Sequence, residues 1–260
     1  MISNRPRYFG ILVVCLLLQA QAKPAGDIIV MTSGTFTAAH LELAADFERS
    51  TTIKVTTTAT SMGVGAESIP SRVQRGEPVD VVIVASDALD DMIKDGRVVV
   101  GSRVDLARSS IGMAVRAGAR KPDISTVAAL TRALLEAQSV AVSSSVSGNY
   151  FTNELFPQLG LADRLKGRVR RIEGERVGAV VARGDAEIGF QQISELLPVP
   201  GIDVVGPLPP EVQRVTVFAA GVAARSKYPD AARAYIRFLA SPAASRAVAK
   251  SGLELQTRLP

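Results

Sequence analysis

Short apolar runs alternate with helical patterns along most of this chain, and turns of small residues often separate the two. Residues 28–30 form one such run, and the segment after it repeats Phe36, Leu43 and Phe47 at spacings that share one helix face. Residues 79–85 are nearly all apolar, which is typical of a strand buried in a parallel sheet. Strands separated by helices in this way predict βαβ units, and therefore an α/β fold with mostly parallel sheets.

Three of the turns that join a strand to a helix are rich in hydroxyl residues, and they span residues 31–37, 58–65 and 143–150. The N-terminus of a helix presents unpaired N–H groups and about half a positive charge, which suits an anion. Serine and threonine at such a place are also what an ordinary N-cap requires. Because the same strand, turn and helix recur, we expect these turns to face one another across a cleft. None of the three contains lysine or arginine, so the site would be built from neutral donors.

The N-terminal segment predicts export. Two arginines precede an apolar run over residues 9–18, and a small-residue cleavage site ends at Ala22. We therefore expect residues 1–22 to be a cleaved secretory signal peptide, with an uncleaved anchor as the alternative, and the mature protein to be periplasmic and soluble. Cys15 is the only cysteine, so its removal would leave no disulfide, thiolate nucleophile or cysteine metal ligand.

The charge balance gives little support for a nucleic-acid partner. The chain has 30 basic and 25 acidic side chains and no tryptophan. Its one dense basic cluster is Arg168, Arg170 and Arg171, which we interpret as the solvated edge of a strand rather than as a nucleic-acid groove.

Residues that could carry catalysis are few. His40 is the only histidine, so a serine–histidine–carboxylate set would have to use it, and a histidine metal cluster is excluded by number. We expect His40 to be a surface or partly buried residue of the first helix. Asp90 and Asp91 fit a solvated helix face, and Asp80 fits a cap. The sequence therefore predicts a protein that is not an enzyme and has no cofactor or metal. The alternatives are a periplasmic hydrolase with His40 as its base, and a ligand-sensing or partner-binding module.

The second half of the chain predicts another βαβ set, with a short strand over residues 186–190 followed by Gln191-Gln192. Residues 198–210 are rich in proline and are interpreted as a surface connection. Ser241-Pro242 predicts the start of the last helix, since serine is a good N-cap and proline fits the first helical position. Open α/β sheets bind ligands at the carboxyl ends of their strands, where the hydroxyl turns and the amide pair fall.

Four motifs make the chain resemble a known family. They are residues 30–37 (VMTSGTFT), 75–87 (RGEPVDVVIVASD), 188–190 (IGF) and 235–244 (YIRFLASPAA). With these motifs the chain resembles the type II periplasmic solute-binding proteins of ABC importers, and in particular the molybdate-binding-like group. The resemblance covers nearly all of the chain after residue 22.

The resemblance implies a two-lobe periplasmic-binding-protein type II fold, in which each lobe is a mostly parallel sheet flanked by helices and the ligand lies in the cleft between them. It places lobe 1 at residues 23–108 and 214–260 and lobe 2 at residues 109–213, with crossings near 108–115 and 212–219. It also implies a monomer that captures a small anion and delivers it to the permease of an ABC transporter, meeting the membrane only there.

The resemblance also assigns ligand-binding positions. Thr35 matches the hydroxyl of the family's first ligand turn, and Ser61 matches that of the second. Ser147 matches the first backbone amide of the second lobe, and the region of Gly174 matches the second amide. With their neighbours, the predicted site residues are Ser33, Gly34, Thr35, Ser61, Met62, Ser147, Gly148, Asn149, Gly174, Glu175 and Gln192.

Gln192 stands where the molybdate binders have a tyrosine hydroxyl. An amide offers donors, but its carbonyl oxygen repels a dianion unless it is turned away. Glutamine at this position therefore favours a ligand that also carries a hydrogen to donate. Both a molybdate-like oxyanion and a small organic acid stay open as the ligand.

Overall fold

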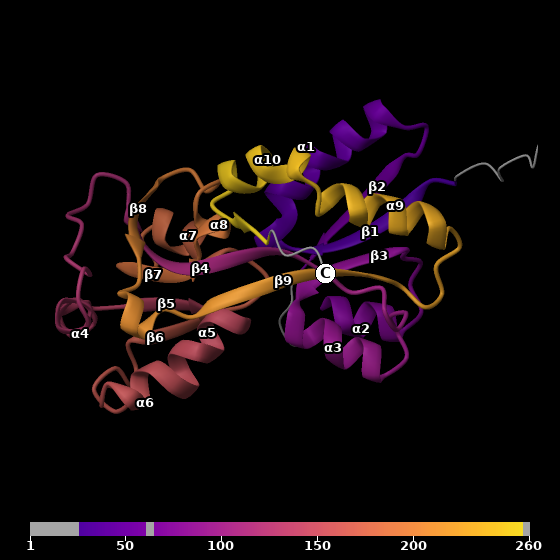
Figure 1. The fold of residues 1–260 in the computed structure, drawn as a ribbon. Helices are drawn as coiled ribbons and strands as arrows, with labels where there is room; N and C mark the ends of the chain where they lie inside the picture. The colour runs from indigo at the N-terminus through magenta and orange to yellow at the C-terminus, as the bar shows by residue number, and fades with distance from the viewer. Residues whose placement is uncertain (1–25, 61–64, 257–260) are drawn as a thin grey trace, which may run out of the picture.

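The computed structural model describes residues 26–60 and 65–256. The ten strands in that part of the chain form one continuous sheet, and helices lie on both of its faces (Figure 1). The sheet has a parallel region at each end, and antiparallel strands join the two regions in the middle. Each parallel region with its helices is one lobe.

The first lobe begins with parallel strands connected by helices. Its elements are β1 (Ile28–Ser33), α1 (Gly34–Ser50), β2 (Val55–Thr60), α2 (Ile69–Gln74), β3 (Val81–Ala85) and α3 (Ser86–Lys94). Both faces of β3 are buried, because Val81 and Ile83 pack in one hydrophobic cluster and Val82 and Val84 pack in another. This two-sided burial is the reason for the apolar run in the sequence.

The second lobe repeats this layout. Its elements are α4 (Val127–Glu136), β5 (Val140–Ser143), α5 (Val146–Tyr150), a π-helical turn (Phe151–Leu155), α6 (Phe156–Gln158), β6 (Val169–Ile172), α7 (Val177–Ala182), β7 (Ile188–Gln192) and α8 (Ile193–Leu196). β5 lies between β6 and β7, and the three strands are parallel. β6 carries Arg170 and Arg171 and lies at the end of the sheet, as the sequence predicts for a solvated strand edge.

One long strand, β4 (Val104–Arg116), runs through both lobes. Up to Ser110 it pairs with β9 (Val215–Val222), which also pairs with β3. From Ile111 onward it pairs with β7. The change of partner between these two neighbouring residues carries the chain from one lobe into the other, close to the crossing that the resemblance implies. The exact lobe boundaries stay a prediction.

The C-terminal segment returns to the first lobe. It comprises α9 (Pro229–Leu239), a 3₁₀ turn (Pro242–Ala244), α10 (Ser245–Lys250) and β10 (Glu254–Leu255), which pairs with β4. In Figure 1 the yellow α9 and α10 lie beside the indigo α1. The last helix is therefore entered through the expected Ser241-Pro242 step, but the first turn after it is 3₁₀ rather than α-helical.

Each lobe has its own hydrophobic core. The large clusters centre on Phe36, Tyr235 and their neighbours in the first lobe and on Phe151, Phe190 and their neighbours in the second. A fully buried aliphatic or aromatic side chain contributes about 1.5–3 kcal/mol. Dozens of such side chains lie inside the lobes. The stability of each lobe therefore does not depend on apolar residues in the cleft, and polar groups can line it.

His40 lies inside the first lobe, not at its surface. Its side chain is fully buried, with Nε2 at 2.8 Å from Thr57 Oγ1 and Nδ1 at 2.8 Å from the Tyr235 hydroxyl. Burial lowers the pKa of His40 to about 4, so the imidazole is neutral. The expectation of a surface or partly buried residue was wrong because partners on β2 and α9 satisfy both ring nitrogens.

Two local expectations need correction. The proline-rich segment 198–210 contains a further strand, β8 (Ile202–Pro207), which pairs with β4. Gln191 and Gln192 belong to β7 rather than to the turn after it, because they pair with the β4 residues Gly112 and Ile111. In both places the antiparallel partner strand comes from a distant part of the sequence.

Asp80, which fits a cap in the sequence, accepts backbone amides from two separate segments. One of its carboxylate oxygens accepts a hydrogen bond from the Ile29 amide at 2.8 Å. The other accepts from Ser226 Oγ at 2.7 Å and from the Lys227 amide at 3.0 Å. Asp80 thus joins β1 to the segment that leads into α9.

Several predictions lie outside the described residues, namely the signal peptide at 1–22, Cys15, Ser61 and Met62. Within the described residues, none of the helices is both long and apolar enough to span a bilayer.

Candidate functional site

A cavity of about 540 Å³ lies between the two lobes. Its volume falls in the range of about 300–1,000 Å³ that is usual for small-molecule sites. Fourteen of its twenty lining residues are polar or charged. The lining residues are Ser33, Gly34, Thr35, Thr37, Ala59, Thr60, Glu67, Ser143, Ser144, Ser145, Val146, Ser147, Ile172, Gly174, Glu175, Arg176, Gln191, Gln192, Glu195 and Phe218.

The first wall is the N-terminal turn of α1. Ser33 is the N-cap residue, but its hydroxyl caps no backbone amide. This hydroxyl is buried and has no hydrogen-bond partner among the described residues. Thr37 Oγ1 donates to the Ser33 carbonyl at 2.9 Å. Thr35 Oγ1 donates across the cleft to Glu195 Oε1 at 3.0 Å. This turn therefore brings the positive end of a long helix to the cavity.

The facing wall is the serine-rich turn after β5. Ser143 Oγ lies 3.0 Å from both Ser145 Oγ and Ser147 Oγ, and it accepts the Gly148 amide at 3.3 Å. A Cβ on Gly148 would lie 1.6 Å from the Ser143 carbonyl oxygen, so only glycine fits there. The hydroxyls are thus held in a fixed arrangement by one another.

The side-chain carbonyl of Gln192, which would repel an anion, is already engaged in a hydrogen bond. Its Oε1 accepts a hydrogen bond from Ser109 Oγ on β4 at 2.7 Å, and its Nε2 donates to Thr216 Oγ1 on β9 at 3.3 Å. The carbonyl is therefore held by the middle of the sheet. The neighbouring Gln191 receives the Val177 amide on its Oε1 at 2.9 Å.

The expectation of a site made only of neutral donors was wrong. Glu67, Glu175, Arg176 and Glu195 also line the cavity. Glu175 is neutralised by Arg183, whose two terminal nitrogens donate to its carboxylate at 2.6 and 2.7 Å. Arg176 makes no ion pair with any described residue. Sequence reasoning missed Glu195 because it lies on α8, beyond the turns that follow the strands.

Glu195 has an altered acidity. Burial in the cleft raises the pKa of its carboxyl, and this effect exceeds the opposing ones. Those are hydrogen bonds from Thr35 and Gln191 and the positive charge of Arg176, each of which lowers the pKa. A carboxyl of this kind can exchange a proton closer to neutral pH than an exposed glutamate can.

The structure brings most of the predicted site residues together. Those that line the cavity are Ser33, Gly34, Thr35, Ser147, Gly174, Glu175 and Gln192. Gly148 and Asn149 do not line it. Gly148 supports the serine turn from behind, and Asn149 faces a neighbouring hollow, where its Oδ1 accepts from Arg171 at 2.5 Å. A ligand-binding role for any of these residues stays a prediction.

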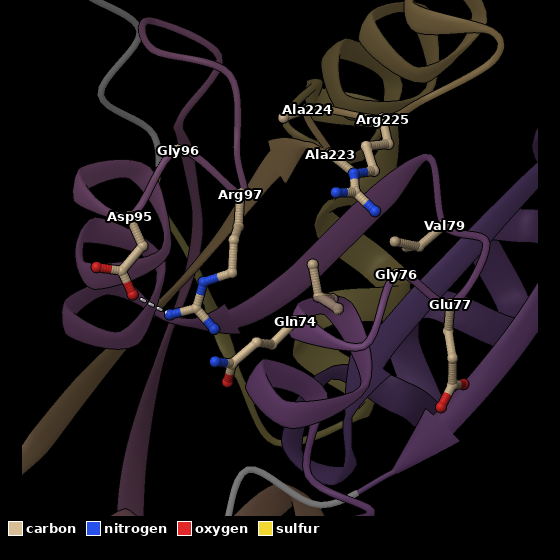
Figure 2. Close-up of a pocket in the computed structure, with 11 residues that line it drawn as sticks. Gln74, Gly76, Glu77, Val79, Asp95, Gly96, Arg97, Ala223, Ala224 and Arg225 are labelled. Carbon is tan, nitrogen blue, oxygen red and sulfur yellow. Dashed lines mark hydrogen bonds and ion pairs between the residues drawn. The ribbon is translucent and has the colours of Figure 1, made fainter.

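A second hollow, of about 490 Å³, lies within the first lobe (Figure 2). Arg97 and Arg225 extend toward it from opposite sides. The Arg97 guanidinium already has partners in the protein, because it pairs with Asp95 and donates to the Pro70 carbonyl at 3.0 Å. This hollow contains none of the hydroxyl turns and no residue of the second lobe, so the interlobe cavity is the candidate site.

Comparisons with known proteins bear on this cavity. A model of the bacterial extracellular solute-binding protein family matches residues 28–254. An aconitate isomerase from Pseudomonas sp is 45% identical over 234 residues, which cover 90% of this chain and 89% of that protein. The molybdate-binding protein ModA of Azotobacter vinelandii is 27% identical over 250 residues, which cover 92% of this chain and 94% of that protein.

The fold is confirmed by solved structures. The periplasmic molybdate-binding protein of Azotobacter vinelandii matches with a TM-score of 0.71 at 20% identity, covering 90% of this chain and 100% of that one. The two-lobe type II fold and the resemblance to the molybdate-binding-like group are therefore correct.

The prediction that the chain is not an enzyme was wrong. It rested on the single histidine and on the absence of familiar nucleophile motifs. A relative that is 45% identical across 90% of the chain and is named an aconitate isomerase overturns it. The physical reason is that proton transfer needs no histidine, and the fold brings a carboxyl, Glu195, into the cleft.

Proposed function

The chain belongs to the bacterial extracellular solute-binding proteins, and from this premise we propose that its interlobe cavity binds a small polycarboxylate and catalyses the isomerisation of aconitate. The observation that carries the proposal is the pair of charged groups in the cavity. Glu195 supplies a carboxyl of raised pKa, and Arg176 supplies a cation with no ion-pair partner among the described residues.

The carboxylate of Glu195 disfavours a metal oxyanion as the ligand. Glu195 accepts a hydrogen bond from Thr35, which is the hydroxyl that the resemblance assigns to the anion. Two like charges about 4 Å apart repel by about 4 kcal/mol at the effective dielectric of a protein surface. A tetrahedral dianion at Thr35 would meet this repulsion, whereas an organic acid can place its carbon atoms nearest to Glu195 and its carboxylates farther from it.

The rest of the cavity suits a molecule with several carboxylates. Arg176 can form a charge-assisted pair with one of them, and serine hydroxyls on the facing wall can donate to another. Phe218, Ile172 and Val146 add an apolar surface for a carbon skeleton. These features support an organic acid more than an inorganic oxyanion.

The chemistry of aconitate requires a proton acceptor. Aconitate is a propene that carries a carboxylate on each carbon, so its geometry is locked by the double bond. The methylene hydrogens are acidified by both the double bond and a carboxylate. Their removal lets the double bond move, and a general base with a raised pKa is suited to this step at neutral pH.

The test is an assay of isomer composition. Purified protein is incubated separately with cis- and with trans-aconitate, and proton NMR follows the vinyl signals. We expect both samples to reach the same isomer ratio, while heat-denatured protein leaves each isomer unchanged. Binding of either isomer without interconversion would refute the isomerase and leave a binding protein.

Solute delivery is the second candidate. The two-lobe fold and the family support capture of a small anion for the permease of an ABC transporter, in a periplasmic protein released from its signal peptide. Uptake of labelled tricarboxylate by cells, lost on deletion of the gene, would support delivery. Unchanged uptake together with lost isomerisation would exclude it.

A further inference from the structure

Glu195 is held at one place by contacts from the other lobe. Its Oε1 accepts the Thr35 hydroxyl at 3.0 Å. A Cβ on Gly34 would lie 2.7 Å from the same oxygen, so the carboxyl approaches the backbone of α1 more closely than any side chain at position 34 would allow. The carboxyl thus lies against the N-terminal turn of α1, which favours its anionic form in part.

A purely structural role does not explain a carboxyl at this position. Glu195 forms no ion pair with a described residue, and its charge is partly removed from water. A glutamine would accept the same Thr35 hydrogen bond without the desolvation of a charge. Carboxyls with perturbed pKa values inside a cleft are typical of functional sites.

We infer that Glu195 is the catalytic residue that removes the methylene proton of the bound tricarboxylate and returns a proton to the far carbon. This inference rests on the proposed isomerase function. Thr35 and Gly34 are positioning residues, because they hold the carboxyl at the N-terminal turn of α1.

The atoms balance without any further reactant. The C–H electron pair of the methylene becomes the new double bond to the central carbon, and the proton goes to Glu195. The old double bond opens, and its far carbon receives the proton from Glu195. The product is again aconitate, with its methylene and vinyl ends exchanged. The geometry of the new double bond is set by the conformation about the bond from the methylene to the central carbon when the proton leaves.

The N-terminal turn of α1 is where we expect the developing charge to be held. Ser33 lines the cavity at the N-terminus of the 17-residue helix α1, it is only 2% exposed, and its Oγ has no hydrogen-bond partner among the described residues. A substrate carboxylate at this turn would gain negative charge as the adjacent carbon loses its proton. Glu195 becomes neutral in the same step, so the charge that develops on the substrate replaces the charge of Glu195 and does not add to it.

The test compares Glu195→Gln with the wild type and with Glu211→Gln, which changes an exposed carboxylate outside the cavity. We expect Glu195→Gln to lower kcat by about 10²–10⁴-fold. It should still bind aconitate, as measured by the shift of its thermal unfolding midpoint. Glu211→Gln should match the wild type. Wild-type turnover in Glu195→Gln would overturn the inference, and so would loss of binding, which would make the carboxyl a ligand or latch.

Failure of the proposed function is a separate outcome, because it appears as no turnover in the wild type itself. If Glu195→Gln does not fold, the kinetics of Glu195→Asp test the role of Glu195 in its place. It keeps the carboxyl but withdraws it by one methylene, so a lower kcat at an unchanged KM supports the inference and an unchanged kcat contradicts it.

The pH profile provides a readout that a structural role would not move. Log kcat/KM of the wild type should fall on the acid side through the raised pKa of Glu195, since the base must be ionised. The charged groups that share the cavity are Arg176, Glu175 with its partner Arg183, and Glu67 with its partner Arg75. The acid limb should shift in Glu195→Asp and stay in place in Glu211→Gln; an unshifted limb in the former contradicts the role.

Discussion

Burial changes the acidity of two residues, His40 and Glu195, which have different roles. Burial lowers the pKa of His40 and raises that of Glu195, in each case because the charged form loses water. His40 has neutral partners on both ring nitrogens and is structural. Glu195 lies beside a cavity and has Arg176 nearby, so its charge can change when a ligand arrives.

His40 makes the stability of the protein sensitive to acid. Its pKa is about 4 when folded and about 6.5 when unfolded, so the folded state takes up the proton less readily. The stability is complete above pH 6.5 and is lost as the pH falls from about 6.5 toward 4. Between pH 7 and pH 5 we expect the wild type to lose about 2 kcal/mol more than His40→Gln, measured by urea unfolding.

The imidazole can also be observed directly, because the chain has one histidine. Its proton NMR signal should not titrate in the folded protein above about pH 5. A midpoint near 6.5 would contradict the burial of His40.

At the scale of elements, the site depends on glycines that let backbones approach. Gly34 lets the α1 turn meet Glu195, and Gly148 lets α5 pack on the end of β5. The glycines themselves offer no side chain to a ligand, yet each of these contacts fixes where polar groups point. The functional turns are therefore properties of pairs of elements rather than of single residues.

Gly148→Ala tests the serine turn. Its new Cβ would meet the Ser143 carbonyl, so α5 must move and the hydroxyl contacts of Ser143 must break. We expect a loss of about 1–3 kcal/mol in the free energy of unfolding and weaker binding of aconitate. Asn153→Ala, an exposed change in the next helical turn, is the control. Unaltered binding in Gly148→Ala would show that the serine turn does not contact the ligand.

At the scale of the whole molecule, the cavity couples the lobes. Each lobe has its own core, and β4 runs through both, so they are connected but separately packed. The Thr35–Glu195 hydrogen bond is made across the cleft. A ligand that contacts both walls stabilises the closed arrangement of the two lobes together.

Ligand binding should therefore raise the stability of the entire chain. At a hundredfold excess over its dissociation constant, aconitate should add about 2.7 kcal/mol to the free energy of unfolding. Arg176→Gln should need at least about tenfold more ligand for the same shift, since a charge-assisted hydrogen bond is worth about 1.5–3 kcal/mol. Arg237→Gln, an exposed change on α9, should behave as the wild type. Stabilisation by molybdate but not by aconitate would contradict the assignment.

The sequence by itself determined the α/β class, because apolar runs such as β3 record burial on both faces. It also indicated the turns that carry Thr35, Ser147 and Gln192, since small hydroxyl and amide residues at strand ends leave a local pattern. Strand β8 was not predicted, because its partner β4 lies far away in the chain and its flanking prolines are typical of a loop.

Only the tertiary structure decided the chemistry of the cleft. Glu195 is 160 positions from Thr35 in the chain, and Arg176 comes from a third segment. No local sequence pattern therefore indicates that the three residues share a cavity. The change in the acidity of Glu195 also arises from burial, which exists only after the lobes pack together. Residue types and spacing determine elements, whereas desolvation and contacts between distant segments determine what those elements can do.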